Sequence, residues 1–232
     1  MRVIKFVVSL PIFVFFLLAG CAKQATLDLG GQRITAPVPQ GFTPLGDRAP
    51  RFRALEERAL SPAKLIEYYL TDRDLQDVLA GHSKFREKSL SITMPAAMYG
   101  SDFSEENFLG ASYFRRNVEG KTFSKDEGLE NNKVEAESRK WGSVPLLSSN
   151  GKWLGVFLDK HDAIGAASVS SVHIDGALKK TLSLSITTRV KNRFIILGCA
   201  SFVSNDSEIY ALEDTCSRWA IDILKDNPDS IN

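Results

Sequence analysis

The sequence of 232 residues predicts an α+β fold: a single domain with one antiparallel sheet of hairpins, packed by a few helices. Two observations predict this class. Two-residue turn signals at Gly30-Gly31, Asn150-Gly151 and Lys191-Asn192 each separate a pair of strand-like segments, which is typical of hairpins. The last predicted helix repeats apolar residues every three or four positions, so one of its faces is expected to pack on the sheet.

In the N-terminal half, strands are predicted at 26–29 and 32–35, and Phe42 is expected to reach the core. A helix is predicted to begin at Ser61-Pro62, because serine is a frequent N-cap and proline suits the first helical position. This helix would present an apolar face made of Leu65, Ile66, Tyr69 and Leu70.

Three further elements are predicted before residue 121. Asp72 is expected to cap a second helix, and 88–94 to form a strand. Ser104 is expected to start another helix, because Glu105 and Glu106 suit the positive end of a helix dipole. Residues 121–140 carry mixed charges and little apolar content, so they predict a solvated loop.

The C-terminal half has the clearest strand patterns. Residues 182–190 alternate between apolar and polar, whereas 193–203 are apolar on both faces and are expected to form a central strand. The apolar alternation slips near Ser170-Ser171, which predicts a β-bulge. The amphipathic C-terminal helix is expected to stop at Asn227-Pro228. Strands at 144–147 and 153–158 are expected to flank Asn150-Gly151.

The charge balance excludes one class of partner. Of 29 basic and 28 acidic side chains, Arg2 and Lys5 lie in the first 20 residues, so the remainder carries a net charge of −1. A near-neutral chain with interspersed charges offers no electrostatic basis for binding nucleic acid.

The N-terminus has the pattern of an export signal. A basic start is followed by an apolar run at 6–19, which is shorter than the roughly 20 residues of a membrane span. The run ends in Leu18-Ala19-Gly20-Cys21, which resembles the lipobox of bacterial lipoproteins. This divides the chain into a signal peptide at 1–20, a lipidated tether at 21–26 and a single globular domain at 27–232.

The lipobox resemblance implies cleavage before Cys21, a diacylglycerol thioether on its sulfur and usually a third acyl chain on its new amine. The expected location is therefore the cell envelope, where the protein would be held to a membrane by its lipid anchor. Because Ala22 stands where an aspartate would resemble the inner-membrane retention signal, the resemblance favours the periplasmic face of an outer membrane.

The two remaining cysteines leave two interpretations open. Cys199 lies about five residues before the end of its strand, roughly 17 Å back along it. Cys216 lies about ten residues into the following helix, roughly 15 Å along it. A helix folded back over the strand would bring the two sulfurs to similar heights for a disulfide. Both could equally be buried free thiols, since both have apolar neighbours.

Residues 34–42, with the sequence ITAPVPQGF, the antiparallel hairpins and the terminal amphipathic helix together resemble the Mog1/PsbP-like fold. That resemblance implies an arrangement of elements. It implies no function, because proteins with one fold serve unrelated roles.

Ser61 and Lys64 at a predicted helix start, followed later by Ser148-Ser149-Asn150, resemble two motifs of the penicillin-binding proteins and serine β-lactamases. The third motif, Lys-Ser/Thr-Gly, does not occur in the sequence. A helix cap at Ser61 and a turn at Asn150-Gly151 account for these residues without catalysis, so no catalytic residue is predicted.

Asp159-Lys160-His161-Asp162 is the densest local group of ligand-type side chains. A polar loop between strands is the favoured interpretation, because His82, His161 and His173 do not fall at metal-motif spacing. We therefore predict neither a metal site nor a cofactor.

Two surface features offer alternatives. Arg189, Lys191 and Arg193 form a basic hairpin tip that could touch anionic lipid or a partner, although charged tips also block strand-to-strand association. Trp141 and Trp153 could form an exposed aromatic patch, with at least one of them expected in the core.

The function expected from these features is that of a non-enzymatic envelope lipoprotein, a binding or assembly module for an envelope protein or a cell-wall component. One alternative is a small envelope hydrolase whose site is assembled from distant carboxylates, Ser61 or His161. A second alternative is a binder of a small apolar ligand.

Overall fold

The computed structural model describes residues 24–82, 86–119, 152–174 and 177–228. Within these ranges, seven strands form one antiparallel sheet in the order β3-β4-β5-β9-β8-β7-β6, and two further strands form a separate hairpin. The strands are β1 (Gln24–Asp28), β2 (Arg33–Pro37), β3 (Phe42–Pro44), β4 (Ala63–Thr71), β5 (Lys88–Pro95), β6 (Lys152–Lys160), β7 (Ala163–Ile174), β8 (Ala177–Val190) and β9 (Arg193–Val203).

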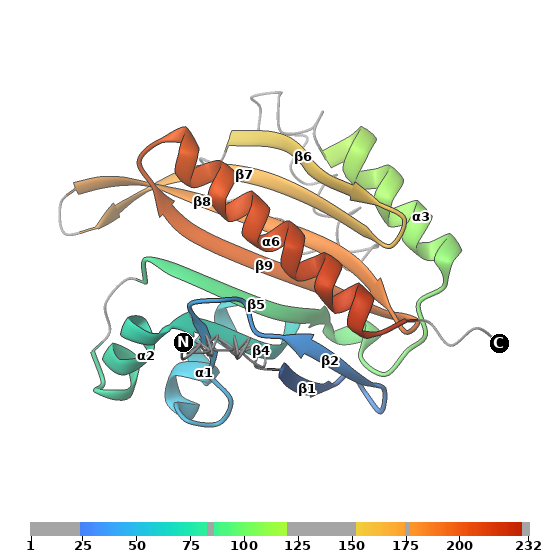
Figure 1. Cartoon of the computed structure of the whole chain (residues 1–232), viewed down its shortest axis with the longest axis horizontal. Coiled ribbons are helices and arrows are strands. Elements are labelled where there is room, and N and C mark those ends of the chain that lie inside the picture. Colours follow the sequence, from blue (N-terminus) through green and yellow to red (C-terminus); the bar gives the residue numbers. More distant parts are fainter. Residues whose placement is uncertain (1–23, 83–85, 120–151, 175–176, 229–232) are drawn as a thin grey trace, which may run out of the picture.

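The helices divide between the two faces of the sheet (Figure 1). They are α1 (Pro50–Ala59), α2 (Asp72–Leu79), α3 (Glu105–Phe114) and α6 (Asp206–Asp226), with a 3₁₀ turn at Ala96–Met98 and a π-helical turn at Arg115–Glu119. Helix α6 and the β1–β2 hairpin cover the face that we call the front, whereas α1, α2 and α3 cover the back. The predicted α+β class, with an antiparallel sheet and a C-terminal helix, is confirmed.

The alternating residues of β9 explain why it is the central strand. Ile195, Leu197 and Cys199 belong to the front core, while Phe194 and Ile196 pack on the back against α3. The predicted bounds 193–203 are those of the strand, and the turn into it has positive φ at Lys191 (47°) and Asn192 (57°). Two successive residues with positive φ form the tight hairpin turn that joins twisted antiparallel strands.

The helix predicted from Ser61-Pro62 is wrong, because residues 63–71 form strand β4. Apolar residues of β4 are buried on both of its faces: Tyr69 packs in the front core and Tyr68 in the back cluster. A run that is apolar on both faces satisfies helical and strand spacing alike. Ser61 therefore caps no helix, and the helix of this region is α1, which buries none of its side chains.

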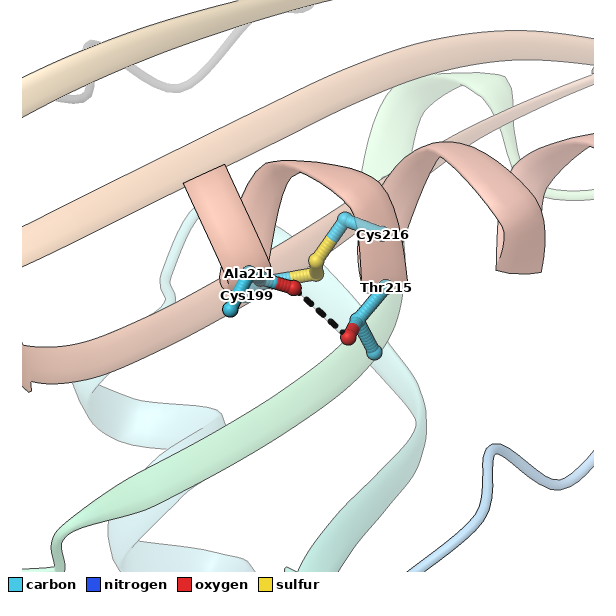
Figure 2. The surroundings of a disulfide bond; sticks show 4 residues. All are labelled: Cys199, Ala211, Thr215 and Cys216. Carbon is cyan, nitrogen blue, oxygen red and sulfur yellow. Dashed lines mark hydrogen bonds between the residues drawn. A yellow bond between two sulfur atoms is a disulfide. The ribbon is translucent and has the colours of Figure 1, made fainter. Parts of the chain in front are cut away.

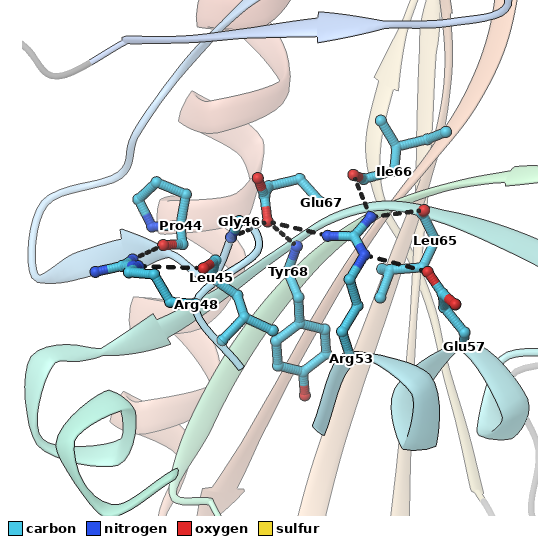
Figure 3. A network of polar contacts seen from close by, with 10 residues as sticks. All are labelled: Pro44, Leu45, Gly46, Arg48, Arg53, Glu57, Leu65, Ile66, Glu67 and Tyr68. Atoms are coloured by element: carbon cyan, nitrogen blue, oxygen red, sulfur yellow. Dashed lines mark hydrogen bonds and ion pairs between the residues drawn. The ribbon is translucent and has the colours of Figure 1, made fainter. Parts of the chain in front are cut away.

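Arg53 of α1 protects the part of β4 that β3 leaves unpaired (Figure 3). Its guanidinium donates to the carbonyl oxygens of Leu65 (3.2 Å) and Ile66 (3.0 Å), beside the bulge that follows Leu65. The same side chain pairs with Glu57, and Glu67 accepts from the backbone amides of Gly46 and Tyr68. These bonds satisfy carbonyls that would otherwise be open to pairing with another strand.

The other predicted elements of the N-terminal half are confirmed, with one change of cap. The β1–β2 hairpin turns at Gly30-Gly31, Phe42 packs against the core, and β5 covers the predicted strand at 88–94. Ser104 caps α3 by accepting from the amide of Asn107. Helix α2 is capped by the Thr71 hydroxyl and not by Asp72, which is already its first residue.

The predicted bulge at Ser170-Ser171 is wrong. The pairing of β7 with β8 runs without a break from Ala163↔Thr188 to Ile174↔Ala177. Near the hairpin end, Ser171 and Leu178 are exposed, so no core dictates the apolar alternation there. Irregular pairing occurs on β6 instead. The predicted loop at 121–140, the predicted strand at 144–147 and Trp141 lie outside the described residues.

Helix α6 closes the front core and is joined to the sheet by a disulfide between Cys199 and Cys216 (Figure 2). It buries Leu212, Cys216, Trp219, Ala220 and Ile223 and ends before Asn227, as the sequence predicts. The two cysteines are 17 positions apart, and a crosslink closing a loop of that size stabilises a fold by about 3 kcal/mol in the chain-entropy model.

The β1–β2 hairpin lies on the front beside α6. Asn227 both donates to and accepts from the backbone of Thr35, and the Trp219 indole donates to the carbonyl of Pro37. Strand β1 begins at Gln24, so residues 24–26 of the stretch predicted as a tether at 21–26 belong to a strand.

At the hairpin turn, Gly30 (φ 72°) packs against the backbone of Gly100 so closely that an added Cβ would lie 2.3 Å from the Gly100 Cα. Its neighbour Gly31 (φ 93°) has nothing within 4 Å of an added Cβ. The two adjacent glycines therefore separate the effect of backbone conformation from the effect of space.

We expect Gly31→Ala to lower the free energy of unfolding by about 1–2 kcal/mol, the cost of a left-handed backbone for alanine. Gly30→Ala should add a steric loss of about 1–3 kcal/mol, because the backbone of Gly100 cannot give way as a side chain would. Urea denaturation of both variants measures the difference. Equal losses would show that the contact with Gly100 contributes nothing.

Candidate interaction surface

Ser61 and Lys64, considered above for a hydrolase, do not lie in one site with His161. Ser61 precedes β4, and the ammonium of Lys64 lies 3.2 Å from the centre of the Tyr99 ring. His161 lies in the turn between β6 and β7. From β4 to β7 is four strand spacings, about 19 Å at roughly 4.8 Å each, so Ser61 and His161 share no site.

The predicted basic tip holds the domain together. Arg189 is buried and pairs with Asp162 (2.8 Å). Arg193, the first residue of β9, pairs with Asp102 and donates to the carbonyl of Leu29. These bonds join the β1–β2 hairpin to the start of β9. The structure therefore favours the interpretation that these charges serve the fold over the one in which they contact anionic lipid.

His161 bridges two elements through an imidazole between two carboxylates. Its Nε2 lies 3.1 Å from Glu105 at the start of α3, and its Nδ1 lies 2.8 Å from Asp162. The pKa of His161 is raised above its ordinary 6.5, first by the hydrogen bond to Asp162 and then by the negative charges of Asp162 and Glu105. Residues 159–162 thus form the end of β6 and a polar turn, and they hold α3 to the sheet. In the described ranges, no three histidine, cysteine or acidic residues come together as a metal site.

A second cross-link lies near the other end of α3. Arg116 pairs with Asp159 on β6, with 2.8 Å between the guanidinium Nε and the carboxylate Oδ2. The hydrogen bond lowers the pKa of Asp159 and raises that of Arg116. Glu105 is the first residue of α3 and Arg116 lies in the π-helical turn directly after it, so the two ion pairs lie near opposite ends of the helix. Two ion pairs therefore fasten the helix to β6 and the following turn.

Exposed apolar side chains lie on each of these two elements, and we call them together the α3–β6 surface. Its members are Leu109 (52% exposed) and Tyr113 (65%) on α3, and Leu154 (41%) and Val156 (38%) on β6. Leu109 follows Glu105 by four residues and Tyr113 precedes Arg116 by three, so both lie on the side of the two ion pairs. An apolar centre bordered by charges is the composition of many protein-binding surfaces.

The local sequence explains why this surface exists. Phe108, Ala111 and Phe114 form the buried stripe of α3, which packs on Ile164, Phe194 and Ile196. Leu109 and Tyr113 fall outside that stripe and cannot reach the sheet. Strand β6 is the outermost strand at one edge of the described sheet, so it has a single neighbour, β7.

Sequence reasoning missed this surface. The sequence predicted the helix that starts at Ser104 but not its exposed apolar residues, although two large apolar residues outside the buried stripe, Leu109 and Tyr113, were a usable signal. Trp153, which was considered for an aromatic patch, is partly buried on β6 and has partners in the structure. The side chain of His173 lies outside the described residues.

The raised pKa of His161 predicts a pH-dependent contribution to stability. Protonated His161 is held by Asp162 and Glu105, so its stabilisation is fully present below its unfolded pKa of about 6.5. The stabilisation is lost as the pH rises through the higher folded pKa. We expect His161→Gln to lower the free energy of unfolding more at pH 6 than at pH 9, as measured by urea denaturation.

The same comparison in an Asp162→Asn background tests the cause, because Asp162 makes the largest contribution to the shift. There the pH-dependent part of the loss should shrink. A loss of equal size at both pH values in the parent background would contradict a charged His161 in this turn.

Comparison with known proteins leaves the family of this chain unassigned. No family model and no curated protein matches the sequence. Among solved structures, the Ran-binding protein Mog1p of Saccharomyces cerevisiae is 10% identical with a TM-score of 0.34, covering 89% of this chain and 93% of that chain. A variant of the protein Mog1 is 9% identical with a TM-score of 0.33, covering 88% and 93%. The chain thus has a weak structural resemblance to the Mog1/PsbP-like fold, and no partner or activity follows from it.

Proposed function

We propose that this protein is a lipid-anchored protein of the cell envelope that acts as a non-enzymatic binding or assembly module. Its anchor would be Cys21, and its binding site would be the α3–β6 surface. The group of exposed apolar side chains between two ion pairs is the observation that carries the binding role. The partner that fits is another envelope protein, on the periplasmic face of an outer membrane if the source has one.

The anchor rests on the sequence at the N-terminus. Leu18-Ala19-Gly20-Cys21 follows a basic start and a short apolar run, the order found in bacterial lipoproteins. Two or three acyl chains, each stabilised by about 0.8 kcal/mol per buried CH₂, would hold the protein to a bilayer far longer than a single chain. No helix in the described part of the chain is both long and apolar enough to cross a membrane.

The disulfide supports an export compartment. Cys199 and Cys216 are both buried, and their bond joins the helix that closes the core to the central strand. Structural disulfides persist in oxidising compartments, whereas the cytosol keeps thiols reduced. A fold stabilised in this way fits a protein that functions beyond the inner membrane.

The α3–β6 surface supports a protein as the partner. Tyrosine is enriched at the energetic centres of protein interfaces, where a large ring and a hydroxyl group contact the partner together. Around Tyr113 and Leu109, the charges of Glu105, Arg116, Asp159 and His161 already form ion pairs with one another. A partner would therefore bury the apolar centre without having to neutralise an isolated charge at its border.

The first prediction concerns the anchor. Cys21→Ala should remove the acceptor sulfur, so the variant should accumulate as an unlipidated precursor. Labelling with palmitate and the intact mass of the protein measure this. Normal labelling of the variant would overturn the lipoprotein assignment.

The second prediction concerns the binding surface. A photo-crosslinking amino acid at Tyr113 in the lipidated protein should capture one dominant envelope protein in intact cells, because this side chain lies at the apolar centre. The matched control is the same amino acid at Leu55, which is 59% exposed on α1 and lies outside the surface. Identical captures at both positions, or none at Tyr113, would contradict a partner at the α3–β6 surface.

A further inference from the structure

We infer that the anchor holds the domain in a fixed orientation, with the β1–β2 hairpin and the C-terminal half of α6 against the lipid headgroups. The back of the sheet, including the α3–β6 surface, would then face the aqueous compartment. This inference rests on the proposed lipidation of Cys21. It adds a membrane-contacting face that the anchor alone does not specify.

The first argument is the length of the connection. Only Ala22 and Lys23 separate Cys21 from Gln24, the first residue of β1. Three Cα-to-Cα steps span at most about 10–11 Å, even when fully extended. The start of β1 is therefore confined to a shell of that thickness above the headgroups.

The second argument is that β1 cannot swing relative to the domain. Leu27 and Leu29 are buried in the front core, and every residue of β1 pairs with β2. The side-chain amide of Gln24 donates to the carboxylate of Asp226 at the end of α6 (3.3 Å). The side chain of Asn227 accepts from the backbone amide of Thr35 and donates to its carbonyl oxygen. A short connection to a rigid element keeps that element, and with it this face of the domain, next to the bilayer.

The third argument is the layered architecture. The β1–β2 hairpin and α6 share the front of the sheet, and α3 lies on its back (Figure 1). Packed layers are spaced about 10 Å apart, so the outer side of α3 lies on the order of 20 Å from the front layer. That distance exceeds the reach of the connection and keeps Leu109 and Tyr113 away from the headgroups.

Charge does not supply the orientation. The exposed ionisable groups of this face have both signs, with Asp28 and Arg33 on the hairpin and Asp222, Lys225 and Asp226 near the end of α6. A mixed surface is neither drawn to an anionic bilayer nor repelled by it. The connection would therefore act alone, and salt should leave the orientation unchanged.

The test uses the full lipidated protein in phosphatidylcholine vesicles that carry a nitroxide on the headgroup. Its own cysteines are occupied by the thioether and the disulfide, so an added cysteine is the single free thiol. Lys225→Cys lies on the front, two residues after buried Ile223, and Glu106→Cys lies on the back at the start of α3. Both positions are exposed, which makes them a matched pair for a fluorescent label.

We expect the nitroxide to quench the label at Lys225→Cys at least several-fold more than the label at Glu106→Cys, at low and at high salt. Equal or reversed quenching in protein that floats with the vesicles would overturn the orientation. Protein that neither floats nor has the mass of the lipidated form would instead overturn the proposed anchor.

A second variant separates tethering from adhesion. A linker of ten residues, made of glycine and serine and inserted between Ala22 and Lys23, spans about 16–19 Å on average. This length is enough to let the domain turn away from the bilayer. The difference in quenching between the two positions should then largely disappear. Its persistence would show that the front surface binds lipid by itself, which would overturn orientation by the short connection.

Discussion

The width of the front face of the sheet is the constraint on which the rest of the molecule depends. Seven strands at about 4.8 Å span close to 29 Å, whereas one helix covers about 10 Å. Helix α6 alone would leave part of this face open to water. The β1–β2 hairpin fills that space. In the same core, the ring centre of Tyr69 lies 5.3 Å from the ring centre of Trp219 of α6, in an edge-to-face contact.

The sequence predicted the elements whose surroundings are one-sided or wholly apolar. In β9 and α6 the apolar pattern and the burial agree, whereas in β8 the alternation predicted the strand although its polar side chains Ser185, Thr187 and Arg189 are buried as well. In β4 the apolar spacing was ambiguous, because it also fits a helix and the helix-start signal Ser61-Pro62 precedes the strand. Helix α1 buries no side chain, and a helix without a core-facing stripe leaves no periodic pattern to read.

The candidate site was hidden from the sequence for a different reason. The α3–β6 surface is made of residues of two elements that are distant in the sequence, and their joining through Arg116 and Asp159 is a property of the tertiary fold. The charges at its border seemed to be separate features, a polar group at 159–162 and an acidic helix start. Only the structure joins them, through Glu105 with His161 and Arg116 with Asp159. The anchor proposed at Cys21 rests on a local motif, so its prediction needed no structure.

The bonds between Asn227 and Thr35 join the two ends of the folded chain, which has a consequence for the order of synthesis. The β1–β2 hairpin leaves the ribosome first, yet the helix that holds it is made last. During export, the N-terminal end would reach the membrane well before its permanent neighbours exist. In the proposed orientation, the part of the domain next to the bilayer would be completed last, and a chain truncated before α6 would leave the α6 side of the front core uncovered.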